Sequence, residues 1–180
     1  MHKLNMNELN RLTVGEFKMV EKIPIVIVLD NIRSQNNIGS IFRTADAFRI
    51  SELHLCGITA TPPHREIHKT ALGSTESVSW KYFPSTMDSI RELKSKGFKI
   101  CAIEQTTYSI PIDRYYPPEN VKIAVIFGNE VRGVDENVIQ EVDICIEIPQ
   151  FGTKHSLNIS VAVGIVIWDL FRKINNVIKM

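Results

Sequence analysis

Several amide side chains and two arginines are concentrated in the stretch LDNIRSQNNIGSIFRTADAF, residues 29–48. A turn between a strand and a helix needs only one or two polar residues, so this surplus indicates a binding site. Asn37 and Gly39 suit a tight turn because both tolerate positive φ angles, and Ser40 or Asn37 could cap the helix that follows. These structural roles leave the two arginines unexplained.

Arg43 is predicted to lie about one turn into that helix and to point back toward the loop. A guanidinium near a helix N-terminus opposes the helix dipole, so a negative group should compensate it. Asp30 or Asp46 could do so as a purely structural partner, and a bound phosphate could do so as a functional one. The spacing alone leaves both interpretations open.

A second polar segment, VIFGNEVRGVDENV, follows a strand-like apolar run at residues 125–138. Gly128 would permit close approach of a ligand to the backbone. Glu130 and Arg132 could form a loop salt bridge, which contributes little if it is exposed. Neither a P-loop nor a G-x-G-x-x-G pattern is present, so the usual nucleotide and dinucleotide fingerprints are absent.

A third polar segment, IPQFGTKHSLNISVAVGI, enters an almost uniformly apolar helix at residues 148–165. Ser156 is a candidate cap for this helix. Asn158 must find a partner in the backbone or in a ligand. A helix that is apolar on nearly all sides is buried on nearly all sides, so the C-terminal helix lies in the core or forms half of a subunit interface.

The elements that position these segments alternate along the chain. Apolar runs predict strands, and amphipathic or capped segments predict helices; a helix with a Thr13–Glu16 capping box is expected within residues 5–21. The strands are expected at 24–30, 52–58, 79–83, 98–105, 121–130 and 144–150, and the later helices at 40–50, 86–97, 135–142 and 156–174. This alternation predicts an α/β domain with a parallel sheet and helices on both faces, whose ligands bind at the carboxyl ends of the strands.

Composition narrows the class of protein. The 180 residues fit one domain, residues 23–180, with a helical extension at 1–22. The N-terminus lacks the apolar block of a secretory signal, and no apolar run could span a bilayer. Three widely spaced cysteines in apolar runs indicate free thiols in a reducing cytoplasm. The net charge of +1 is not typical of a nucleic-acid-binding protein but does not exclude one.

A metal site is not expected. His64 and His68 are four residues apart, a spacing that could hold a metal on a helix, but no third ligand lies nearby in the sequence. The HREIHK segment, residues 64–69, fits a small basic patch for RNA phosphates or a solvated loop about equally well.

The three polar segments resemble the three motifs of the SpoU (TrmH-like) branch of the SPOUT RNA methyltransferases. Motif one matches NNIGSIFRTADAF, motif two matches IFGNEVRG, and motif three matches IEIPQFGTKHSLNISVAVGI, in that order, framing about residues 23–172. The resemblance implies an α/β fold with a deep C-terminal trefoil knot, a homodimer, and methyl transfer from S-adenosylmethionine to a ribose 2′-hydroxyl of tRNA or rRNA.

The resemblance also implies roles for individual residues. The predicted catalytic set is Arg43, Asn37, Glu130, Ser156 and Asn158, and the predicted cofactor-binding set is Glu104, Gly128, Ile148, Ser156, Leu157 and Asn158. A guanidinium stays protonated and is a poor general base, so Arg43 is expected to orient the target phosphate and hydroxyl and to stabilise the developing alkoxide. Glu130 is expected to form a salt bridge to an arginine. The alternative is a noncatalytic RNA-binding or ribosome-assembly protein that retains the knotted fold.

Overall fold

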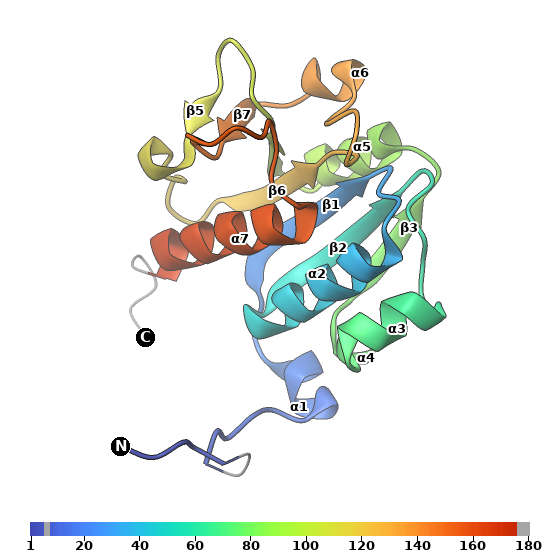
Figure 1. Ribbon diagram of the computed structural model, residues 1–180, viewed down its shortest axis with the longest axis vertical. Helices are drawn as coiled ribbons and strands as arrows, with labels where there is room; N and C mark the ends of the chain where they lie inside the picture. The colour runs from blue at the N-terminus through green and yellow to red at the C-terminus, as the bar shows by residue number, and fades with distance from the viewer. Residues whose placement is uncertain (6–7, 176–180) are drawn as a thin grey trace.

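In the residues that the structure describes, 1–5 and 8–175, seven strands form one wholly parallel sheet in the order β3-β2-β1-β6-β4-β7-β5 (Figure 1). This structure is a computed structural model. The strands are β1 Ile23–Asp30, β2 Ile50–Cys56, β3 Trp80–Phe83, β4 Phe98–Ile103, β5 Ile110–Pro111, β6 Lys122–Phe127 and β7 Ile144–Glu147. The helices are α1 Val14–Met19, α2 Gln35–Ala47, α3 Arg65–Ala71, α4 Ser74–Ser77, α5 Thr86–Ser95, the 3-10 helix η1 Ile112–Arg114, α6 Glu136–Ile139 and α7 Ile159–Asn175.

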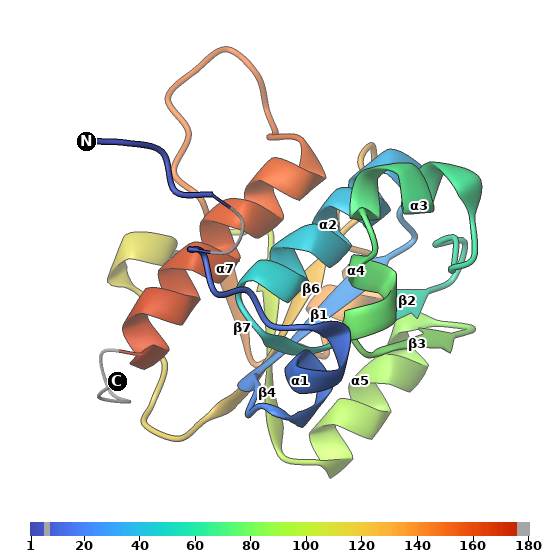
Figure 2. The same ribbon diagram turned by 90° about the horizontal axis from the view of Figure 1, so that it is seen from below.

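Helices cover both faces of the sheet, which confirms the predicted α/β architecture. Figure 2 shows α2, α3 and α7 on one side and α5 on the other. Successive side chains of a strand point to opposite faces, so Ile25, Ile27 and Leu29 of β1 join the core beneath α2 and α7, whereas Val26 and Val28 join the core beneath α5 and α6. No helix in the described part of the chain is long and apolar enough to cross a membrane.

The C-terminal helix α7 has one buried face and one exposed face. Val163, Val166, Ile167 and Leu170 are buried in the main core, where α7 lies beside α2 (Figures 1 and 2). The opposite face of α7 is open to solvent. The helix is therefore a core element and also leaves a surface free for another contact.

The N-terminal helix is shorter than the sequence predicted. The expected capping box is present, because the Thr13 side chain accepts from the Glu16 N–H and the Glu16 carboxylate accepts from the Thr13 N–H. The helix nevertheless covers only Val14–Met19, and Phe17 is its one buried residue. Residues 6–7 and 176–180 lie outside the described residues.

The strand-to-helix turn before α2 also differs from the prediction. The helix starts at Gln35 and not at Ser40, and Ser34 caps it by accepting from the Asn37 N–H at 3.3 Å. Asn37 and Gly39 therefore lie inside α2. The positive φ that the turn requires, 57°, occurs at Asn31.

Gly39 is required by helix packing and not by the turn. A Cβ at this position would lie 2.1 Å from Thr70 Oγ1 and 2.4 Å from the Ile67 carbonyl oxygen of α3. The missing side chain therefore lets α3 pack directly on the first turns of α2, and it fixes the position of the HREIHK segment beside motif one.

Candidate active site

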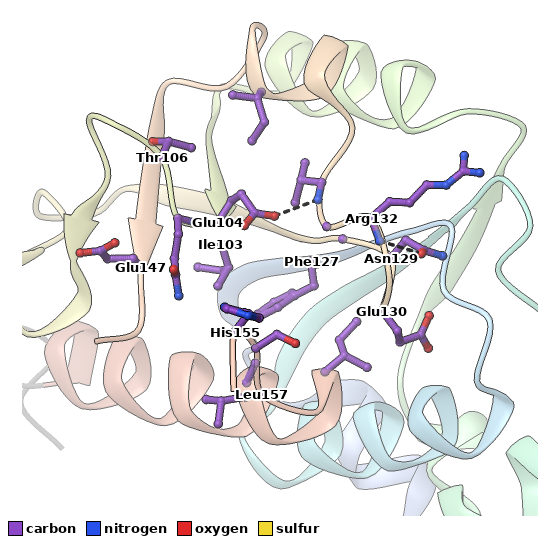
Figure 3. Close-up of a pocket in the computed structure, with 18 of the residues that line it drawn as sticks. Ile103, Glu104, Thr106, Phe127, Asn129, Glu130, Arg132, Glu147, His155 and Leu157 are labelled. Atoms are coloured by element: carbon purple, nitrogen blue, oxygen red, sulfur yellow. Dashed lines mark hydrogen bonds between the residues drawn. The ribbon is translucent and has the colours of Figure 1, made fainter. Parts of the chain in front are cut away.

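A cavity of about 710 Å³ opens at the carboxyl ends of β4, β6 and β7 and is bounded by the segment 148–158 and the start of α7 (Figure 3). This volume is within the range of small-molecule sites. Its lining is mixed. The apolar members include Ile103, Phe127, Ile148, Leu157 and Ile159, and the polar members include Glu104, Gln105, Thr106, Glu130, His155 and Ser156.

The loop after β6 forms one wall of the cavity and is held by its own backbone. Asn129 and Gly133 exchange two backbone hydrogen bonds, each 2.9 Å long. A Cβ on Gly128 would lie 2.1 Å from the Gly133 carbonyl carbon and 2.2 Å from the Val134 nitrogen. The close approach predicted for Gly128 is therefore made by the loop's own backbone, and Gly128 also lines the cavity.

Glu104 ties the end of β4 to the same loop. Its Oε2 accepts from the Val134 N–H at 3.0 Å (Figure 3). Its Oε1 accepts from the Gln105 N–H at 3.0 Å. A side chain at Gly133 would collide with this carboxylate, since a Cβ there would lie 2.3 Å from Oε2. Glu104 thus shapes the wall through backbone contacts, and both of its oxygens are already engaged.

Glu130 links motif two to motif one across 97 residues of sequence. Its carboxylate accepts from the backbone N–H groups of Arg33 at 3.1 Å and Ser34 at 3.0 Å. These contacts replace the expected salt bridge, because no ion pair of Glu130 is found among the described residues. Burial acts to raise the pKa of Glu130, but the backbone hydrogen bonds and the Asn37 side chain outweigh it and lower the pKa.

Replacing Glu130 by Gln is expected to lower the free energy of unfolding at neutral pH by about 1 kcal/mol, a small value because the carboxylate is exposed. Since folding lowers the pKa, the carboxylate stabilises the fold above the ordinary glutamate pKa, and this contribution disappears as the pH falls through the lowered value. Urea unfolding over a series of increasingly acidic buffers should show the two proteins converging in acid. A difference that stayed constant with pH would contradict this assignment.

Asn37 and Asn158 meet beside the cavity and join α2 to α7. The Asn158 Nδ2 donates to Asn37 Oδ1 at 3.2 Å. The Asn158 Oδ1 accepts from the backbone N–H of Ser160 at 2.9 Å and from its hydroxyl at 2.7 Å, so Asn158, and not Ser156, caps α7. Neither asparagine is among the residues that line the cavity, whereas Ser156 is.

Arg43 lies about two turns into α2, further along than predicted, and its side chain is exposed outside the cavity. The carboxylate of Asp30 accepts from Thr86, and that of Asp46 accepts from Ser77. Within residues 1–5 and 8–175 the Arg43 guanidinium has no hydrogen bond or ion pair, so neither candidate aspartate compensates it. The two structural partners considered for Arg43 are therefore not used, and the phosphate interpretation stays a prediction.

Sequence reasoning missed two residues of the site. Asn129 donates through Nδ2 to the Asn31 carbonyl oxygen at 2.7 Å, and its Oδ1 accepts from the N–H groups of Val131 and Arg132. Its place inside the GNE of motif two was the available signal. His155 lines the cavity next to Phe127 in Figure 3, and no pattern in the sequence singled it out.

No group of three or more metal-binding side chains gathers in the described part of the chain. His64 instead caps α3, since its Nδ1 accepts from the Glu66 N–H at 3.3 Å.

A parallel α/β sheet with a mixed cavity at its carboxyl edge, walled by loop backbone and lacking a glycine fingerprint, defines a class of ligand-binding α/β proteins. Within that class, this chain belongs to the SpoU rRNA Methylase family, whose model matches residues 24–168. The recognition from the three motifs is thereby confirmed.

The individual relatives share less than a third of the aligned residues with this chain. The chain is 29% identical over 150 residues to the tRNA (guanosine(18)-2′-O)-methyltransferase of Borreliella burgdorferi, covering 83% of this chain and 67% of that protein. It has the same identity over 150 residues to the mouse tRNA (guanosine(18)-2′-O)-methyltransferase TARBP1, of which it spans 9%. The crystal structure of an AdoMet-bound rRNA methyltransferase from Sinorhizobium meliloti matches with a TM-score of 0.78 and 26% identity, over 87% of this chain and 59% of that one. The chain thus spans only part of these proteins.

Proposed function

We propose that this protein transfers a methyl group from S-adenosylmethionine to a ribose 2′-hydroxyl of tRNA or rRNA. The observation that carries the proposal is that segments from motifs two and three line one cavity, while Asn158 and Glu130 tie that cavity to motif one. The names of the relatives and the AdoMet-bound structural neighbour support the same reaction.

The residues present fit this cofactor. The cavity combines apolar surface, which suits an adenine ring, with polar groups from three loops. Gly128, Ile148 and Leu157 would contact the adenine, and Ser156 would complete the pocket. Glu104 would act mainly by holding the wall in place, because its oxygens are engaged by backbone N–H groups. When bound, the cofactor supplies a methyl group already activated by a sulfonium, so the protein mainly contributes alignment and exclusion of water.

The catalytic set would act as one positioning unit. Glu130 and Asn158 hold the start of α2, and Asn37 would hold Arg43 or the ribose. Arg43, exposed along the same helix, would bind a phosphate of the RNA and stabilise charge developing on the target hydroxyl oxygen. No metal is required in this scheme.

Three finer features are part of the proposal. The strand-end loops at about Glu104, Gly128 and 148–158 would form the C-terminal trefoil knot of the family, with the last helix threading a loop. Residues 23–180 would form the methyltransferase domain, with 1–22 as an extension that the buried Phe17 anchors to the main core. A cytoplasmic location stays a prediction.

We also propose a homodimer through the outer face of α7. Val161, Ile165 and Trp168 are 50%, 38% and 50% exposed and are spaced three and four residues apart, so they form one apolar stripe. Apart from the adjacent residues and the backbone of α7 itself, no atom of the described residues lies within 4 Å of a Cβ at Gly164, which leaves room for close approach of another helix. A stripe of this kind on a helix fits a second copy of the same surface.

Replacing Ile165 by Arg is expected to convert the dimer into a folded monomer, because the new charge would be buried in the interface but exposed in the single chain. Sedimentation velocity measures the change. Replacing Met19, an 88% exposed residue of α1, by Arg is the matched control and should leave the dimer intact. A wild-type protein that is monomeric at micromolar concentration would contradict the proposed interface.

The test of the reaction is methyl incorporation from labelled S-adenosylmethionine into RNA from a strain lacking this protein, followed by mapping of the 2′-O-methyl sites. Calorimetry measures cofactor binding separately. We expect saturable cofactor binding and methylation of a defined site in tRNA or rRNA. Binding of RNA without cofactor binding or methyl incorporation would overturn the proposal in favour of a noncatalytic RNA-binding or ribosome-assembly protein.

A further inference from the structure

A second cavity, of about 480 Å³, adjoins the first at the carboxyl ends of β1 and β2. The loop residues Asn129, Val131, Arg132 and Gly133 line both cavities and form their common wall. The remaining lining residues come from the end of β1, from the segments directly after β1 and β2, and from the residue that caps α6. The residues proposed above to hold the cofactor do not line this second cavity, so the proposed reaction leaves it unexplained.

Two arginines of this cavity have free guanidinium groups. Arg33 and Arg132 are both exposed, and within the described part of the chain neither side chain has a hydrogen bond or an ion pair. In Figure 3 the Arg132 side chain points away from the first cavity. An arginine pair without carboxylate partners is suited to a ligand with negative oxygens.

The carboxylates of the cavity do not neutralise these arginines. Asp30 is only 2% exposed, and its oxygens accept from Thr86, from Asn31 and from the Asp135 N–H. Asp135 is exposed, and its Oδ1 caps α6 by accepting from the Asn137 N–H at 2.9 Å. Asp135 therefore retains one oxygen that can accept from an exocyclic amino group or a ring N–H.

Exposed aliphatic side chains complete the lining. Ile58 is 66% exposed and Val131 is 77% exposed. The Tyr82 hydroxyl donates to the carbonyl oxygen of Gly57, the residue before Ile58, at 3.1 Å, and this contact holds the Tyr82 side chain at the edge strand β3. Proteins bind single-stranded RNA with cationic groups on the phosphates and with side-chain surface, most often aromatic, against the faces of the bases. In this cavity aliphatic side chains would supply that surface.

We propose that the second cavity binds a nucleotide of single-stranded RNA next to the nucleotide that is methylated. This inference rests on the proposed function. Ile58 and Val131 contact the base, and Arg33 and Arg132 bind the phosphate. Glu130 lies in the loop that separates the two cavities, and its carboxylate accepts from the Arg33 N–H. An RNA strand that crosses this loop places consecutive nucleotides in the two cavities.

The test uses fluorescence anisotropy with a labelled single-stranded oligouridylate of about 12 nucleotides and an RNA duplex of equal length, titrated between about 50 and 200 mM salt. Arg132→Gln should weaken single-strand binding several-fold and reduce the salt slope by about 0.7, the value for one lost phosphate contact. Ile58→Ser should weaken it about fivefold without changing the slope, because it removes apolar contact only. Arg114→Gln, which removes an exposed arginine from η1 at the opposite edge of the sheet, is the matched control and should change little.

Separate measurements distinguish the failure of this inference from the failure of the proposed function. Calorimetry should show unchanged S-adenosylmethionine affinity in Ile58→Ser, because Ile58 lines only the second cavity. The inference is overturned if Arg132→Gln behaves like Arg114→Gln, or if it weakens duplex and single-strand binding equally. The proposed function fails instead if the wild-type protein binds the oligouridylate but transfers no methyl group to any RNA.

Discussion

Arg43→Ala is expected to reduce methyl transfer to RNA by about 10²- to 10³-fold, the loss typical of removing one donor that stabilises developing negative charge. Affinity for S-adenosylmethionine should stay the same, because Arg43 does not line the cavity. The free energy of unfolding should also stay the same, since the guanidinium is exposed and bonds to no described residue. Single-turnover kinetics, calorimetry and urea unfolding measure the three quantities.

Two further variants sharpen this experiment. Arg43→Lys keeps the positive charge but loses the planar pair of donors, so it should recover RNA affinity more than the rate of methyl transfer. Arg114→Ala removes an exposed arginine far from motif one and should leave all three quantities unchanged. A large loss of cofactor affinity in Arg43→Ala, or full activity, would exclude the proposed role of this residue.

The architecture was predictable from the sequence because its signal is local. Runs such as IVIVL in β1 and IAVIF in β6 are apolar at every position, which is what a strand buried on both faces requires. The apolar character of α7 was also evident from the sequence, but the sequence did not show which of its residues are buried and which are exposed. The sequence left core and interface as alternatives, whereas the helix buries Val163 and Val166 and exposes Val161 and Ile165.

Details of the site depend on contacts between distant segments and were less predictable. Nothing local to Glu130 indicates that its partners are the N–H groups of Arg33 and Ser34, so a salt bridge was the natural but wrong expectation. The same contact is made at the cap of α2, where the helix starts earlier than its apolar pattern suggested. Because of that earlier start, Arg43 lies about two turns into the helix and not one.

The loop after β6, which forms one wall of the cavity, was also only partly predictable from the sequence. The sequence predicted that a ligand could approach the backbone closely at Gly128. In the structure the atoms that approach this position are those of Gly133 and Val134 in the same loop. A glycine that a ligand requires and a glycine that a folded loop requires look alike in one sequence, because both are defined by what a Cβ would meet in three dimensions.

Gly128→Ala is therefore expected to damage the cavity by distorting the backbone of the loop after β6. The added methyl would lie 2.1 Å from the Gly133 carbonyl carbon and 2.2 Å from the Val134 nitrogen, so backbone atoms must move. That movement pulls the Val134 N–H away from Glu104, and the wall between β4 and β6 opens. We expect a loss of about 1–3 kcal/mol in the free energy of unfolding and at least a tenfold loss of S-adenosylmethionine affinity.

Gly152→Ala is the matched control for this change, because Gly152 lies in the segment 148–158, parts of which bound the same cavity. Apart from its chain neighbours, no atom of the described residues lies within 4 Å of a Cβ at Gly152. Urea unfolding and calorimetry on both variants separate a loop that must keep its shape from a loop that merely lies near the ligand. Equal cofactor affinity in the two variants would mean that the loop after β6 can relax without cost, and that the wall it forms does not determine binding. A selective loss in Gly128→Ala would instead show that cofactor affinity depends on the contact between Glu104 and Val134, which keeps the wall of the cavity in shape.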